Sequence, residues 1–135
     1  MSVVSRMMET YPGKLAGMDT SALQECIEAC LDCTEACTAC ADACLNEPMV
    51  QELTACISLN LDCADVCETT ARLLSRHTGT ETAMTRSMLE ACAMACRVCG
   101  EECARHAEMH AHCRVCAESC ARCEKACRAL LATLT

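Results

Sequence analysis

Residues 26–44 read CIEACLDCTEACTACADAC, with a cysteine at every third or fourth position in strict alternation. This 4-3-4-3-4 spacing follows one face of an α-helix, the face on which helical bundles usually place Leu and Ile. Cysteines return at similar spacing over residues 56–67, 92–103 and 113–127, which brings the total to 18 in 135 residues. The sequence therefore predicts helices whose buried faces are lined with thiols.

Turn and capping residues divide the first half of the chain into two long helices. Residues 19–21, Asp-Thr-Ser, offer an N-cap for a first helix that runs to about residue 46. Pro48 favours the start of a second helix at about Met49, and Thr78-Gly79 is a C-cap signal that ends this helix near His77.

The second half predicts two further helices. A third helix begins near Thr80, and a break in the phase of the cysteines places a turn at about residues 107–112. Without that turn, one helix would be about 80 Å long at about 1.5 Å per residue, too long for a small domain to cover. We therefore predict an all-α fold, an antiparallel up-down-up-down four-helix bundle over residues 20–135, preceded by a short N-terminal arm over residues 1–19.

Composition excludes several classes of function. The net charge of −8 argues against binding to nucleic acid or to an anionic membrane surface. No stretch is apolar for long enough to span a membrane, and the first ten residues do not resemble an export signal. We therefore expect a cytoplasmic protein with no membrane partner, whose cysteines are kept reduced.

A disulfide framework is the first alternative use of so many cysteines. It is disfavoured because neighbouring helical positions hold their Cβ atoms about 5–6 Å apart, whereas a disulfide needs about 3.5–4.5 Å. A second alternative is that cysteine is only a small core residue. That reading explains poorly why Leu and Ile are almost absent from the middle of the predicted bundle.

Thiolates select Cu(I), Zn(II) or iron–sulfur clusters. Zn(II) with four thiolates is a −2 unit, so several such units in one core would repel each other. One Cu(I) per thiolate instead leaves the core neutral, and Cu(I) accepts the two or three sulfurs that a continuous row offers. Iron–sulfur clusters usually take their ligands from loop motifs that this chain lacks. Charge balance therefore favours multiple Cu(I) ions as the cofactor, with zinc storage as the alternative.

The candidate metal ligands are all the cysteines and two histidines: Cys26, Cys30, Cys33, Cys37, Cys40, Cys44, Cys56, Cys63, Cys67, Cys92, Cys96, Cys99, Cys103, Cys113, Cys116, Cys120, Cys123, Cys127, His106 and His110. The fold predicts that one end of the bundle collects Met49, His106, Met109, His110 and His112. The other end is predicted to be closed by Leu23, Leu73, Leu74, Met84, Met88, Leu130 and Leu134. We expect metal to enter at the end with the histidines.

Asn60 interrupts the row of thiols in the second helix, where the spacing calls for a cysteine. A buried Asn fixes helix pairing in coiled coils. Its side-chain oxygen can also bind a metal ion, and the sequence leaves both roles open.

The cysteine-lined helices and the stretch Cys103-x-x-His106-x-x-x-His110-x-x-Cys113-x-x-Cys116 resemble the bacterial four-helix-bundle copper storage proteins, specifically their cytosolic branch. The resemblance covers roughly residues 20–134. It implies that many Cu(I) ions fill the bundle through thiolates, and that the protein is a homotetramer of bundles.

We therefore predict a protein that stores copper without catalytic turnover. A ferritin-like enzyme would need Glu-x-x-His pairs, which the chain lacks, and a metal-responsive DNA-binding regulator would need a basic face. A copper chaperone stays open as an alternative, although delivery requires one exposed site rather than a buried row.

Overall fold

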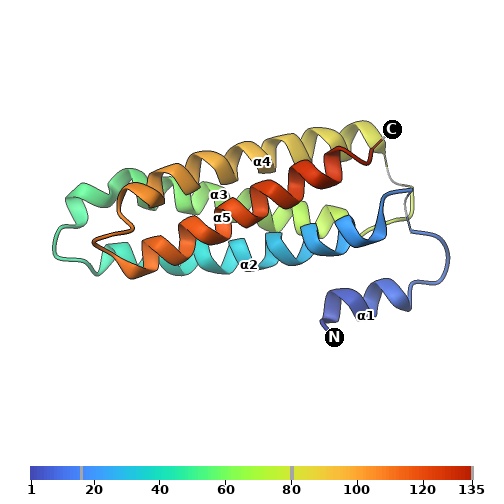
Figure 1. Ribbon diagram of the computed structural model, residues 1–135, viewed down its shortest axis with the longest axis horizontal. Coiled ribbons are helices and arrows are strands. Elements are labelled where there is room, and N and C mark those ends of the chain that lie inside the picture. The colour runs from blue at the N-terminus through green and yellow to red at the C-terminus, as the bar shows by residue number, and fades with distance from the viewer. Residues whose placement is uncertain (16, 80, 135) are drawn as a thin grey trace.

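The four long helices form the predicted antiparallel bundle (Figure 1). The computed structural model describes residues 1–15, 17–79 and 81–134, in which helices joined by turns and irregular connections are present and no strand is. In chain order the described elements are α1 (Val3–Glu9), α2 (Thr20–Leu45), the 3-10 helix η1 (Val50–Leu53), α3 (Thr54–Leu74), α4 (Thr82–Arg105) and α5 (Ala111–Leu131).

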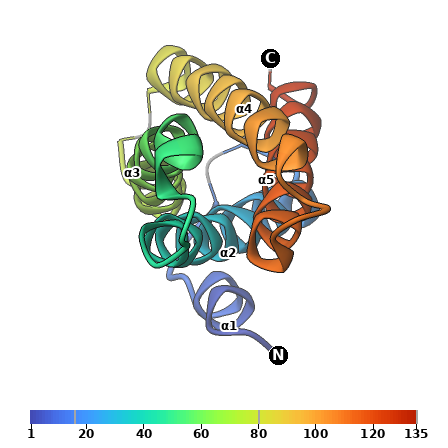
Figure 2. The same cartoon turned by 90° about the vertical axis from the view of Figure 1, so that its left-hand side faces the viewer.

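Each long helix packs against two neighbours, so that α2, α3, α4 and α5 surround one central axis (Figure 2). The α2–α3 and α4–α5 connections lie at the same end of the bundle, on the left in Figure 1. The two ends therefore differ in composition, as expected from the order of the helices. None of the described helices is long and apolar enough to cross a membrane.

Residues before the bundle form α1, which lies outside the four-helix ring and packs along α2 (Figure 2). Ser2 caps this helix, because its hydroxyl oxygen accepts a hydrogen bond from the Ser5 amide at 3.0 Å. Val4 and Met8 face the bundle, whereas Val3 and Met7 are exposed. The N-terminal arm predicted from the sequence therefore contains a helix of about two turns.

The observed start of α2 agrees with the N-cap predicted from the sequence, whereas the observed ends of α3 differ from the predicted ones. Asp19 is the N-cap of α2, and its carboxylate accepts a hydrogen bond from the Ala22 amide at 2.8 Å. The second helix was predicted from Met49 to His77, but the α-helical part is shorter. The residues after Pro48 form a turn and then η1, and Ser75 ends α3 by donating its hydroxyl to the Ala71 carbonyl at 2.7 Å.

The third helix begins at Thr82, and Thr80, where its start was predicted, lies outside the described residues. Met88 was predicted to help close one end of the bundle on the same face as Cys92, but the structure buries Leu89 and Thr85 there instead. The physical reason is the alternation itself. Steps of three and four residues lead from Cys92 to Leu89 and then to Thr85, so Met88 is turned partly away from the axis.

Candidate metal centre

All eighteen cysteines lie on the inner faces of the four helices, with 0–1% of each side chain exposed. Every one is a free thiol, so the disulfide framework considered from the sequence is not formed. Helical periodicity explains this arrangement, because a residue every three or four positions stays on one face through about five turns of α2. The predicted lining of the bundle with thiols is confirmed.

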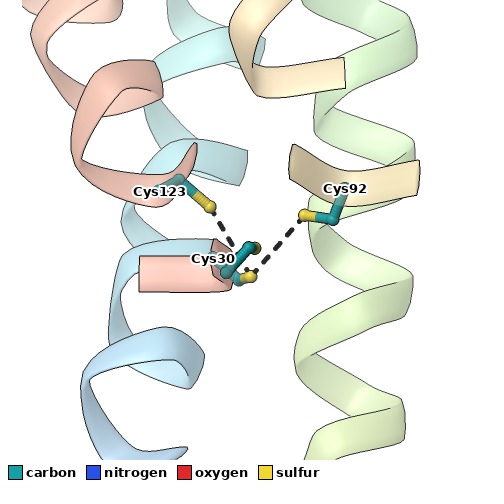
Figure 3. Close-up of side chains that lie close together, drawn as sticks. Cys30, Cys92 and Cys123 are labelled. Carbon is teal, nitrogen blue, oxygen red and sulfur yellow. Dashed lines mark hydrogen bonds between the residues drawn. The ribbon is translucent and has the colours of Figure 1, made fainter. Parts of the chain in front are cut away.

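Sulfur atoms from different helices lie close enough to share an ion. Cys30 on α2 lies 3.6 Å from Cys123 on α5 and 3.9 Å from Cys92 on α4 (Figure 3). A disulfide requires about 2.0 Å between sulfurs, whereas a Zn–S bond is about 2.3 Å, so a gap of this size fits one ion between two thiolates.

The thiols form overlapping groups of four, in which all sulfurs lie within 4.8 Å of one another. The groups include Cys30, Cys92, Cys123 and Cys127; Cys33, Cys63, Cys67 and Cys96; Cys33, Cys37, Cys63 and Cys120; Cys37, Cys99, Cys116 and Cys120; and Cys40, Cys44, Cys56 and Cys113. The second and third of these groups share Cys33 and Cys63, and the third and fourth share Cys37 and Cys120. Close sulfur pairs such as Cys67 and Cys92, 3.9 Å apart, join the first group to the second, so the core is a row of closely spaced donors. Separate tetrahedral zinc sites would each need four sulfurs of their own, so the overlap favours ions that bridge shared thiolates.

The open end of the bundle, here called the mouth, carries Glu47, His106, His110 and His112. Glu47 lies between two histidines: its Oε2 is 3.0 Å from His110 Nδ1 and 2.9 Å from His112 Nε2. The two imidazole rings stack with their centroids 5.6 Å apart. The predicted ligand His106 instead faces Glu102 of its own helix, with Nε2 2.9 Å from the carboxylate.

His112 is the mouth residue that reaches the thiols. Its Nδ1 lies 3.3 Å from Cys40 Sγ and 3.7 Å from Cys113 Sγ. From the sequence, His112 was placed at this end without a role, and Glu47 was not predicted to lie there. Met49 is half-buried and Met109 is 67% exposed, so these two side chains do not line the core.

The closed end of the bundle, opposite the mouth, is filled by a layer of buried leucines. Leu23, Leu74, Leu89 and Leu130 are each at most 1% exposed. The prediction that Met84 helps to close this end is wrong, because its side chain is 60% exposed. The predicted face of α4 was one position out of register, which also misplaced this residue.

Comparison with known proteins places this arrangement in a family. The family model described as copper storage protein matches residues 19–132, which cover all four long helices. The chain belongs to the copper storage protein family. This agrees with the resemblance drawn from the cysteine register.

Solved members of the family share the fold closely. The copper storage protein Ccsp of Streptomyces lividans, solved loaded with 10 copper equivalents, is 59% identical and has a TM-score of 0.95; the match covers 98% of this chain and 100% of that chain. The Cu(I)-bound copper storage protein BsCsp3 of Bacillus subtilis is 34% identical, with a TM-score of 0.73 and coverage of 82% and 98%.

A curated relative extends the comparison. The uncharacterised cysteine-rich protein YhjQ of Bacillus subtilis strain 168 is 37% identical over 109 residues, covering 81% of this chain and 95% of the relative. Most of each protein is therefore included in these matches, and the similarity spans the whole bundle.

Asn60 is fully buried among the thiols of this family member. Its Oδ1 lies 3.0 Å from both Cys99 Sγ and Cys116 Sγ, so each thiol can donate a hydrogen bond to it, and Nδ2 lies 3.5 Å from Cys56 Sγ. The side chain thus connects α3 to α4 and α5. These contacts support the role in helix pairing, and they also place an oxygen donor in the row of sulfurs.

Burial keeps the thiols nearest the mouth protonated in the metal-free protein. It raises the pKa of Cys44 from 9.0 to about 11 and the pKa of Cys113 to about 12. The charged thiolate is disfavoured there because water is excluded. At Glu47 the hydrogen bond from His112 lowers the pKa, so this carboxylate is ionised at neutral pH. This end of the metal-free protein therefore combines a negatively charged carboxylate with protonated thiols.

Proposed function

We propose that this protein stores Cu(I) in the cytosol, holding many ions per chain through the eighteen thiolates of the bundle core. The observation that carries the proposal is the row of closely spaced buried thiols, in which several of the four-membered groups share sulfurs. A neutral core results when each Cu(I) replaces one thiol proton, which a dry, closed interior requires. Membership of the copper storage family and the copper-loaded relatives support the same function.

The copper enters as cargo, and no turnover is proposed. All eighteen cysteines serve as ligands that bind one ion or bridge two. His106 and His110 flank the way in at the mouth, where each faces a carboxylate. Ions reach the inner groups from this end, because the opposite end is closed by leucines that have no metal-binding atoms.

The assembly and the domain division belong to the same proposal. The resemblance to the family supports a homotetramer of bundles. Residues 1–19 would act as an arm on each bundle of residues 20–135, and the exposed Val3 and Met7 of α1 are available for a contact between chains.

The test is an anaerobic titration of reduced protein with Cu(I) in competition with a strong Cu(I) chelator. If the protein stores copper, each chain should bind many equivalents of Cu(I) before the chelator begins to bind the added copper. Uptake of only about one or two equivalents would contradict storage and favour a chaperone. Protein filled first with Zn(II) should release it to Cu(I), since Cu(I) prefers thiolates in low coordination; retention of zinc would support the zinc alternative.

A matched set of variants tests the ligands. Changing the group Cys33, Cys63, Cys67 and Cys96 to Ser should lower the capacity in proportion to the lost thiols, whereas changing Ser5, Ser21, Ser75 and Ser87 to Ala should not. Unchanged capacity in the first variant would show that copper lies elsewhere.

A further inference from the structure

The N-terminal arm is attached to the closed end of the bundle by its tyrosine. The hydroxyl of Tyr11, two positions after α1, lies 3.1 Å from the hydroxyl of Thr78 in the connection between α3 and α4. The Tyr11 ring also meets the His77 ring edge to face, with centroids 5.1 Å apart and planes at 76°. These contacts span 67 positions of the chain and lie at the end where the α1–α2 and α3–α4 connections come together (Figure 1).

The packing of α1 itself against the bundle is incomplete. Val4 and Met8 are half-buried against the core, on one side of this short helix. A hollow of about 430 Å³ that opens to solvent lies beside them, with Glu9 of the arm and Thr20 and Gln24 of α2 among its lining residues. The helix therefore covers only part of the surface that it faces, and the contacts of Tyr11 are a second, separate attachment of the arm.

Two glycines lie between Tyr11 and the start of α2. Gly13 has a φ of 135° and Gly17 a φ of 49°, values that side chains other than glycine rarely adopt. Such residues let the backbone change direction at low cost. The arm also lies outside residues 19–132, which the family model matches. It is thus a segment that can move as a unit, with one aromatic side chain as its anchor.

His77 holds this anchor in a place where a charge is poorly accommodated. Its Nδ1 is buried, and within the described part of the chain this atom has no hydrogen-bond partner. A neutral imidazole that carries its proton on Nε2 leaves only a lone pair there. Protonation would put a charged N–H donor at Nδ1 with no acceptor, which is costly. Burial accordingly lowers the pKa of His77.

The neighbouring charges do not offset this cost. The charged groups nearest to the contact in the chain are Arg76, Lys14 and Glu81. Two of them are cations, and the Glu81 carboxylate accepts a hydrogen bond from a backbone amide at the start of α4. A cation–π attraction from the Tyr11 ring would favour a protonated His77, but it supplies no acceptor for the buried N–H. The docked arm is therefore compatible with the neutral imidazole.

We propose that Tyr11, His77 and Thr78 form a pH-sensitive latch, which holds the arm on the bundle while His77 is neutral and releases it when His77 is protonated. Release moves the Tyr11 ring away and gives water access to Nδ1. It also uncovers Val4 and Met8, so acidification enlarges the apolar surface that the arm offers to another chain. The latch lies at the end opposite the mouth and does not involve the thiols.

Tyrosine fluorescence and near-UV circular dichroism report the latch without a label, because the chain has one Tyr and no Phe or Trp. The pKa of His77 is lower in the docked state, so docking should be strongest above about pH 6.5, the ordinary value for histidine, and weaken below it. In metal-free protein taken from about pH 7.5 to about pH 5, the Tyr11 signal should approach that of an exposed tyrosine.

Amide hydrogen exchange tests the same release independently. After correction for the intrinsic pH dependence of exchange, the amides of α1 (Val3–Glu9) should exchange several-fold faster at the lower pH, whereas those of α3 and α5 should be unchanged. Equal acceleration in all helices would show unfolding of the bundle and would contradict a latch.

Matched variants identify the titrating group. His77→Phe keeps a ring against Tyr11 but takes up no proton, so its arm should stay docked at both pH values. His106→Phe, a half-buried histidine at the mouth, is the control and should keep the wild-type pH response. Tyr11→Phe removes only the contact with Thr78 and should speed the exchange of α1 by about two- to tenfold.

Three results would overturn the proposal. They are a Tyr11 signal that is constant over this pH range, the same pH response in His77→Phe as in the wild type, and docking that tightens on acidification. Tyr11→Leu, in which exchange is the readout, should release the arm at both pH values and keep the full Cu(I) capacity. An arm that stays protected in this variant would show that Tyr11 is not its anchor.

Discussion

Replacing Leu89 by Ala separates the residues that stabilise the bundle from those that hold copper. Leu89 is fully buried in the apolar layer of the closed end. Removing three carbon atoms from a tightly packed site lowers the free energy of unfolding by about 2–5 kcal/mol. For 135 residues, an unfolding entropy of about 2.1 cal/mol/K per residue converts this loss to a fall in Tm of roughly 7–18 °C. The Cu(I) capacity should not change, because Leu89 is not a ligand.

The assay is far-UV circular dichroism of reduced, metal-free protein during heating, with Cu(I) capacity measured in parallel. Met84→Ala is the matched control on the same helix, since its side chain is 60% exposed and its loss should change Tm by only a few degrees. Equal effects of the two substitutions would refute the packing of α4 described here. A loss of capacity in Leu89→Ala would refute the division between a closing layer and a metal-binding row.

Three further perturbations test other parts of the bundle. Gly100→Ala would place a Cβ 3.1 Å from Cys120 Cβ, so α4 and α5 would have to move apart. This movement should lower the free energy of unfolding by about 1–3 kcal/mol, whereas the better helix propensity of Ala raises it by about 1 kcal/mol. A raised Tm would therefore contradict the close approach of the two helices. Raising the pH should destabilise the metal-free protein from about pH 9 upward: burial raises the pKa values of Cys44 and Cys113 to about 11 and 12, so the folded state keeps protons that the unfolded chain loses. The Tm of metal-free protein should therefore be level below pH 9 and fall above it, whereas copper-loaded protein, without these protons, should not show the fall. Arg122→Ala removes an exposed ion pair with two carboxylates of α2 and should lower stability by at most about 1 kcal/mol, less still in high salt; a larger, salt-independent loss would contradict a surface role.

Cysteine periodicity predicts the bundle and its lining because burial and spacing are linked by helix geometry. The same rule, carried on through Cys92 by alternating steps of three and four, identifies Leu89 and Thr85 as buried. The choice of Met88 put two steps of four residues in succession and so broke that alternation. The error shows that strict alternation of the steps identifies the buried face of α4 correctly.

The mouth could be predicted only in part. Histidines near a helix boundary are visible in the sequence, but the partner that orients them is not. Glu47 lies in the connection between α2 and η1, outside any periodic stretch, and meets His112 across 65 positions of the chain. Such a contact depends on where two connections meet in space, which helix periodicity does not encode.

The difference between the two ends gives copper movement a direction. An ion that loses its water must find replacement ligands at once, and the mouth offers carboxylate, imidazole and thiol atoms within a few ångströms of each other. The closed end offers leucine side chains, which replace no lost hydration. We therefore expect uptake and release to use the same end of the row. On this expectation, ions held by Cys40 and Cys113 leave before an ion in the group of Cys30 and Cys123 can leave.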